Sequence, residues 1–304
     1  MMIFTTEIYD GILKQYNLGY PIKKTEQFEY RRIGGTRKAG LKFVYTQQEL
    51  LEYARCVNDI VYFIETYCKI TNPDGRLGYI KLFDYQKEVL KNYQEKKFNI
   101  FFTSRQVGMT SLMSLIFLHY MTFNVDKTIT CMDIINKYNK LFIQKIKTTY
   151  RSLPFFLQQG ISKLSNEIIE FENGCRIRTW TANKNLAVGY IPDVLYMSNF
   201  SRMRDKKYIY ENLLPIITAR KGCKFIIHSG PNGHDFFYEL VVNSERSEAD
   251  PDKNIFKTQR IHWWQVPGRD ENWKKEMIKL YGQNVWDEEF DFRFIIHEDK
   301  KKKK

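Results

Sequence analysis

Short apolar runs alternate with helix-patterned segments through the middle of the chain. Runs typical of buried strands occupy residues 99–103, 128–133, 193–198 and 224–229. The segments between them that carry helical spacing are 111–123, 136–153 and 206–220, and we expect the last of these to stop around Pro215. This alternation predicts an α/β fold with a mostly parallel central sheet and helices on both faces. In such sheets ligands bind at the carboxyl ends of the strands.

The N-terminal half shows helical spacing instead. Thr46 is a candidate N-cap for a helix over 46–70, with apolar residues repeating on one face. A cluster of turn residues follows at 71–78, and a second helix is predicted over 84–95. Farther on, Asn173-Gly174 joins two alternating runs and predicts a hairpin over 168–180.

The ends of the chain are basic. We interpret residues 1–45, which include the basic, glycine-containing stretch 31–40, as an N-terminal arm, and 296–304 as a basic tail. The net charge is +13, of which five charges come from the terminal lysine run, so the remainder carries 13 − 5 = +8. That excess favours a polyanionic partner such as nucleic acid, although a solvated basic surface explains it equally well.

Cysteine usage and hydropathy limit the class of protein. The five cysteines are scattered without a C-x-x-C pair, which indicates reduced thiols rather than a zinc site. No apolar run approaches the roughly 18 residues that a membrane helix needs, and we expect no membrane partner.

The strand at 99–103 runs into SRQVGMTS (104–111), a turn that resembles a phosphate-binding loop. In a G-x-x-x-x-G-K-[ST] loop, backbone N–H groups wrap the phosphates, a lysine reaches the terminal ones, and a hydroxyl holds magnesium. Gly108 stands at the second glycine, and Thr110 and Ser111 supply hydroxyls. Met109 occupies the lysine position, where packing in a core is its simplest role.

These segments together resemble the ATPase domain of the large terminase subunit of tailed phages, a DNA-packaging motor. SRQVGMTS is similar to the Walker A turn S-R-Q-x-G-K-[ST] of that family, and YQKEVL (85–90) is similar to its entry segment. VLYMSN (194–199) lies where the family has four apolar residues followed by Asp-Glu, and KFIIHSGPNG (224–233) is similar to its coupling motif. The resemblance covers roughly residues 50–295, and we expect one terminase-like domain over 46–295.

The resemblance implies a nucleotide site with roles for individual residues. Gln86 would contact adenine, and Arg105 matches an arginine that some terminases use as an internal finger. The nucleotide-binding set would be Gln86, Ser104, Arg105, Gln106, Gly108, Met109, Thr110 and Ser111, and the coupling motif Ser229, Gly230, Pro231, Asn232 and Gly233.

Three of the four charged parts that phosphoryl transfer needs are replaced. The lysine is Met109, the Walker B aspartate is Ser198, and the catalytic glutamate is Asn199. Removing one such group typically lowers the rate about 10²- to 10⁵-fold. Asp133, at the end of another strand, is a possible substitute metal ligand beside Thr110 and Ser111. ATP and Mg²⁺ are therefore expected to bind weakly or not at all.

The sequence leaves three functions open. The first is a hydrolysis-deficient pseudo-ATPase of a DNA virus that acts as a structural, regulatory or DNA-binding partner. The second is a working packaging ATPase with relocated ligands, and the third is a protein-interaction scaffold that binds no nucleotide. The resemblance also implies double-stranded DNA bound without sequence preference, other packaging-machine or viral proteins, a possible homo-oligomer, and the cytoplasm of the infected host cell. The family continues into a nuclease domain, and since this chain stops where that domain would begin, we expect no nuclease activity.

Overall fold

A computed structural model describes residues 28–72, 74–183 and 192–294. The terminal lysine run and the first part of the proposed arm lie outside these residues. The described chain divides into two compact units: residues 28–82, 111–128 and 140–178 form the first, and residues 83–110, 129–139 and 179–294 form the second. The helices within the described ranges are too short or too polar to cross a membrane.

The strands belong to two sheets. A small hairpin pairs β1 (Lys69–Thr71) with β2 (Leu77–Tyr79), so the expected turn cluster is the connection of a hairpin. The large sheet has the order β10-β3-β9-β8-β4-β7-β6-β5. Its strands are β3 (Phe98–Thr103), β4 (Thr128–Asp133), β5 (Ile161–Leu164), β6 (Ile168–Phe171), β7 (Arg176–Thr181), β8 (Val194–Ser198), β9 (Lys224–Ser229) and β10 (Lys257–Ile261). This confirms the expected α/β class with a mostly parallel sheet.

The second unit is built on parallel strands. β10 pairs with β3, β3 with β9, β9 with β8 and β8 with β4, all in parallel. Their carboxyl ends therefore meet at one edge of the sheet. Along this edge β9 separates β3 from β8, so the strand before the phosphate-type loop and the strand that ends in Ser198 are next-nearest neighbours.

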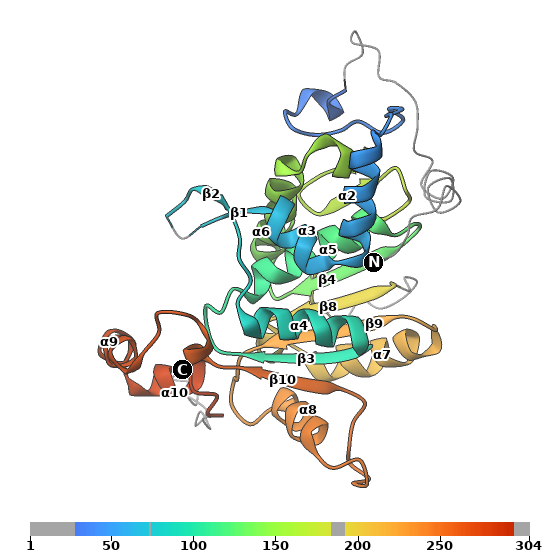
Figure 1. The fold of residues 1–304 in the computed structure, drawn as a ribbon. Helices are drawn as coiled ribbons and strands as arrows, with labels where there is room; N and C mark the ends of the chain where they lie inside the picture. The colour runs from blue at the N-terminus through green and yellow to red at the C-terminus, as the bar shows by residue number, and fades with distance from the viewer. Residues whose placement is uncertain (1–27, 73, 184–191, 295–304) are drawn as a thin grey trace, which may run out of the picture. The chain divides into compact units, whose positions relative to one another are not determined.

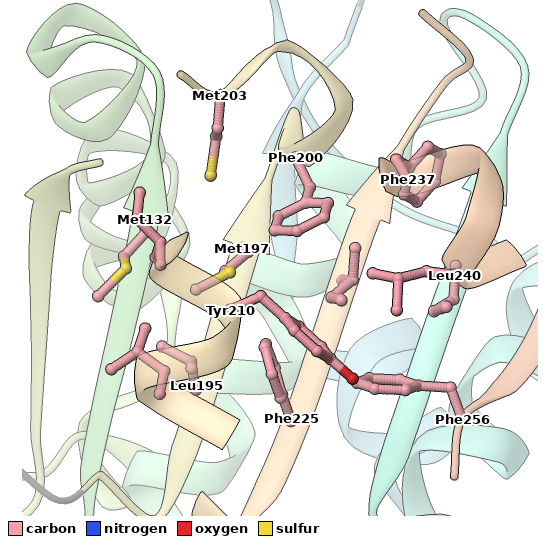
Figure 2. Packing of buried hydrophobic residues seen from close by; sticks show 14 of the residues in the cluster. Met132, Leu195, Met197, Phe200, Met203, Tyr210, Phe225, Phe237, Leu240 and Phe256 are labelled. Atoms are coloured by element: carbon pink, nitrogen blue, oxygen red, sulfur yellow. The ribbon is translucent and has the colours of Figure 1, made fainter. Parts of the chain in front are cut away.

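Helices cover both faces of these strands. The helices of the second unit are α4 (Asp84–Glu95), α7 (Lys206–Ala219), α8 (Phe236–Glu245), α9 (Glu271–Tyr281) and α10 (Gln283–Glu289). α7 and α8 contribute Ile209, Leu213 and Val241, among others, to a buried cluster with alternate residues of β3, β8 and β9 (Figure 2). α4 lies along β3 (Figure 1). Because side chains alternate across a strand, residues of β3 outside this cluster, such as Phe101, face away from α7 and α8.

α7 corrects one expectation. The helix continues through Pro215 to Ala219, whereas the sequence predicted a stop at the proline. Proline inside a helix removes one hydrogen bond and costs about 3 kcal/mol. The buried residues Leu213 and Ile217, which flank the proline in the cluster, offset that loss through packing.

The first unit holds the N-terminal helices and the antiparallel strands. Its helices α2 (Gln47–Asn58) and α3 (Ile60–Tyr67) replace the single helix expected over 46–70, while α5 (Met109–Phe123) and α6 (Asn136–Ser152) begin in the second unit and continue in the first. Thr46 is the predicted N-cap: its hydroxyl accepts from the N–H of Glu49 in a capping box. The break falls at Asp59, whose carboxylate accepts from the N–H of Tyr62 and starts α3. Strands β6 and β7 pair antiparallel, as Asn173-Gly174 predicted.

Arg37 is the buried centre of the basic stretch. Its guanidinium donates to the carbonyl oxygens of Gln158 and Leu41, both at 2.9 Å, and lies 3.4 Å from the Glu172 carboxylate. It also faces the ring of Phe155 at 5.5 Å. Arg37 is therefore a structural cation that ties residues 28–45 to the first unit, and it is not part of a basic surface.

Candidate functional site: the carboxyl edge of the parallel strands

The turn after β3 has the backbone of an anion-binding loop. Gln106 and Gly108 both have positive φ, of 61° and 75°, and α5 begins at the next residue, Met109. Successive N–H groups in such alternating conformations converge into a concave nest, and the N-terminus of a helix adds its own free donors. Within the described chain, the N–H groups of Gln106, Val107 and Gly108 donate no hydrogen bond. The loop therefore keeps the donors that would face a phosphate.

The lysine position of this loop is part of the core. Met109 is only 4% exposed, and so contributes packing in place of charge. Thr110 and Ser111 follow in the first turn of α5, and both are partly exposed. The Ser111 hydroxyl accepts a hydrogen bond from the Lys145 ammonium at 3.0 Å, a contact within the first unit that the sequence did not predict.

Other residues brace the loop. The Ser104 N–H donates to the carbonyl oxygen of Ile261 at the end of β10, and the buried Ser104 hydroxyl has no partner among the described residues. The Tyr85 hydroxyl donates to the carbonyl oxygen of Val107 at 2.8 Å. These contacts fix the loop from both of its sides.

Gln86, the expected adenine contact, is buried beneath the loop. Its Oε1 accepts from the N–H of Phe83 at 3.1 Å and caps α4. Its Nε2 would lie 3.3 Å from a Cβ added to Gly108. In this arrangement Gln86 packs against the glycine of the loop, which explains why a residue without a side chain is needed there.

Asp133 joins Ser198 and Asn199 at the ends of β4 and β8. Asn199 has a left-handed backbone (φ 56°), and its side-chain amide donates to both carboxylate oxygens of Asp133, at 2.9 and 3.1 Å. Burial raises the pKa of the Asp133 carboxyl, while hydrogen bonds from Asn199, the Ile134 N–H and Ser198 act in the opposite direction. The proposed substitute ligand therefore lies beside the two replaced positions, and its charge is engaged by the Asn199 amide.

This donor set is a poor match for a magnesium ion. P-loop enzymes hold the ion with a loop hydroxyl and a carboxylate at the Walker B position. Thr110 supplies the hydroxyl, but Ser198 supplies a neutral oxygen. Among the described residues, no group of three or more His, Cys, Asp or Glu side chains is arranged to hold a metal ion.

The coupling-like turn after β9 connects two of the strand ends. The Ser229 hydroxyl donates to the Ser201 hydroxyl at 2.8 Å, and the Asn232 amide donates to the Ser201 carbonyl oxygen at 3.2 Å. A Cβ added to Gly230 would lie 3.3 Å from the carbonyl oxygen of Thr103. Pro231 is buried and Gly233 has a φ of 71°, so the turn is compact. A movement at the end of β3 or β8 would therefore reach this turn directly.

His228 links the same three strands through its ring. Its Nε2 lies 3.1 Å from the Thr103 hydroxyl of β3, and its Nδ1 lies 3.0 Å from the Tyr196 hydroxyl of β8. Burial lowers the pKa of His228 to about 4, so the ring is neutral at physiological pH. This is the geometry of a core histidine.

Arg105 is held by residues far along the chain. Its N–H donates to the carbonyl oxygen of Glu289 at 2.9 Å, and its guanidinium lies 3.9 Å from the Glu289 carboxylate. Arg269 donates to the carbonyl oxygens of Arg105 and Gln106 at 3.2 and 2.8 Å. Sequence reasoning missed Glu289 and Arg269, because single charged residues so distant along the chain carry no local signal.

The parallel strands, the loop between β3 and α5, and the helices on both faces define an α/β fold of the P-loop ATPase kind. The fold is similar to the large terminase ATPase domain of Thermus phage P74-26 (TM-score 0.58, 14% identity, 71% of this chain and 94% of that chain). It is also similar to the HK97 bacteriophage large terminase (TM-score 0.60, 13% identity, 78% of this chain and 54% of that chain).

A third similar structure is the large terminase of another thermophilic bacteriophage in complex with ADP (TM-score 0.56, 12% identity, 70% of this chain and 54% of that chain). The aligned part thus spans about half the length of this chain's HK97 and ADP-bound counterparts and nearly all of the P74-26 domain. No family model matches the sequence. At these identities the likeness establishes the fold, and it confirms the fold that the sequence resemblance implied.

Proposed function

We propose that this chain is a terminase-like ATPase-fold module of viral DNA packaging that binds phosphate groups without efficient hydrolysis. The observation that carries the proposal is the contrast between backbone and side chains at the carboxyl edge. The loop keeps its nest of N–H groups, while Met109 is buried at the lysine position and Ser198 stands at the Walker B position. Binding through the backbone requires only the former, whereas hydrolysis requires the charges as well.

The proposal is tested by two measurements on the full chain. Isothermal titration with ATP and Mg²⁺ should give weak binding, and a phosphate-release assay should give no turnover above background. Gly108→Asp, which places a carboxylate at the loop, should abolish the binding, and Gly222→Asp, at a glycine with open space around it, is the matched control. Turnover of about 1 s⁻¹ or faster, as in ordinary enzymes, would overturn the proposal.

A working ATPase with relocated ligands is the second candidate, because Asp133 lies next to Ser198 and Asn199. In that case Asp133→Asn would abolish a turnover that the wild-type protein displays. A protein-interaction scaffold without nucleotide is the remaining alternative. Thermal stabilisation by ATP, which follows from binding to the folded state alone, argues against the scaffold.

The proposed setting is the cytoplasm of an infected host cell, with double-stranded DNA and other packaging proteins as partners. The exposed side chains of Arg204 and Lys207, just after the degenerate strand end, support contact with phosphates. In the same stretch Lys206 is paired with Asp235 and Arg202 with Glu289, so they contribute less.

A further inference from the structure

One carboxylate from the C-terminal helices joins two arginines from separate strand ends. Glu289 is the last residue of α10, and its carboxylate accepts a hydrogen bond from the Arg202 guanidinium. The same carboxylate lies 3.9 Å from the guanidinium of Arg105. Arg105 follows β3 and Arg202 follows β8, so the pair flanks the carboxyl edge at which the loop lies.

Stability alone is a weak explanation for this arrangement. The side chains of Arg105 and Arg202 are 53% and 43% exposed, and ion pairs at such positions contribute at most about 1 kcal/mol. Two guanidinium groups around one carboxylate also leave an excess of one positive charge. A phosphate group carries about two negative charges and matches the forked geometry of arginine, so it would neutralise the pair more completely.

The helix that carries Glu289 has its own hydrophobic support. Trp263, Trp286 and Phe290 form a buried cluster apart from the one beneath α7 and α8, and Trp273 packs against it. Arg269 stacks on Trp273 at 4.5 Å while it donates to the loop carbonyl oxygens. Glu289 can therefore leave the arginines through a rearrangement of α10 that keeps the central cluster intact.

We propose that Arg105 and Arg202 form a phosphate-binding site and that Glu289 occupies it as an internal anion. The ligand is a phosphate-bearing anion, whether inorganic phosphate, pyrophosphate or the phosphates of a nucleotide. It displaces the Glu289 carboxylate, binds both guanidinium groups, and receives N–H donors from the loop. The two arginines then supply the positive charge that Met109 does not. This inference rests on the proposed function and adds a competing group to it.

The test is titration calorimetry of the full chain with inorganic phosphate, pyrophosphate and ATP in separate arms. Glu289→Gln keeps the size of the side chain and removes its charge, so pyrophosphate affinity should rise about tenfold, as expected when one charged hydrogen bond no longer competes. Glu276→Gln, an exposed glutamate on α9, is the matched control and should leave the affinity unchanged.

A second variant keeps the test decisive if Glu289→Gln does not fold. Arg202→Gln removes one guanidinium outside the loop and should weaken pyrophosphate binding about tenfold or more. Unchanged pyrophosphate affinity in either variant overturns the inference, and so does binding of ATP alone, since recognition would then lie in the base. These outcomes differ from failure of the proposed function, which would appear as turnover of ATP by the wild-type chain.

Discussion

The side-chain amide of Asn199 donates to both oxygens of the Asp133 carboxylate, at 2.9 and 3.1 Å. The position that the terminase resemblance assigns to a catalytic glutamate is thus occupied by a donor, and its neighbour on β4 is an acceptor. The two residues are complementary, so restoring one charged group without changing the other should create a conflict.

Asn199→Glu is expected to lower the free energy of unfolding by about 1–3 kcal/mol, because it removes the donor and leaves a buried carboxylate beside a second one. Urea denaturation at pH 7 measures the change. Asp133→Asn in the same chain should recover most of the loss, since an amide can donate to the new glutamate. Additive losses in the double variant would show that the two side chains are not coupled.

Gly108→Ala is expected to destabilise the chain by more than Gly222→Ala. Both glycines have positive φ, so each substitution incurs the left-handed strain of about 1–2 kcal/mol. Gly108 alone of the two has a neighbour close to the new Cβ, since Gln86 Nε2 would lie at 3.3 Å, whereas Gly222 has open space. Thermal denaturation of the two variants compares them directly, and equal losses would contradict the proposed packing of Gln86 on the loop.

Stability should fall as the pH drops from about 6.5 towards 4. Burial lowers the pKa of both His228 and His119 to about 4, so in this range the unfolded chain binds protons that the folded chain does not. Each histidine contributes up to about 1.4 kcal/mol per pH unit, and its contribution is complete above pH 6.5. Urea midpoints measured between about pH 4 and 8 should show a shallower slope for His228→Gln, while the exposed His234→Gln keeps the wild-type slope.

Arg37→Met is expected to lower the free energy of unfolding by about 3–5 kcal/mol, because it leaves the Glu172 carboxylate without its partner and two carbonyl groups without donors. Arg32→Met removes the same charge from an exposed side chain and should change stability by less than about 0.5 kcal/mol. Chemical denaturation of the two variants would refute a structural role for Arg37 if the losses were similar.

Duplex DNA affinity should fall steeply as salt rises from about 50 to 200 mM, because binding to phosphates releases counterions. Replacing both Arg204 and Lys207 with glutamine should lower the slope of log K against log salt by about 0.9 for each phosphate that is no longer neutralised. Lys163→Gln, at an exposed lysine of the first unit, is the control, and fluorescence anisotropy is the measurement. An affinity that does not respond to salt would exclude the electrostatic mode.

Local sequence signals predicted much of the fold. The Asp84–Glu95 helix, the Thr128–Asp133 strand and the Lys224–Ser229 strand have the expected bounds, because each is a continuous pattern ended by polar or turn residues. The break at Asp59 was missed because the apolar spacing continues across it while a side-chain cap restarts the helix. β10 and α8 were not predicted, since β10 is an edge strand with exposed Lys257 and Arg260 and therefore lacks a clear apolar run.

The candidate site divides in the same way. The loop, its glycine and the neutral side chains at 109, 198 and 199 were evident from the sequence, because each lies in a motif of contiguous residues. The roles of Glu289, Arg269 and Arg202 depend on chain segments that meet only in the folded protein. Asp133 lies between these cases: its place at a strand end was predictable, but its bond to Asn199 depends on the order of strands in the sheet.

The aromatic cluster around α9 and α10 gives the chain an intrinsic optical reporter. Trp263, Trp264, Trp273 and Trp286 are four of its five tryptophans, and all lie in or beside the segment that ends in Glu289. Excitation of the indole rings therefore samples this segment far more than the five parallel strands of the second unit, which contain no tryptophan. A rearrangement of α10 would change emission without any added label, so the same protein solution can report both the occupant of the arginine pair and the integrity of the fold.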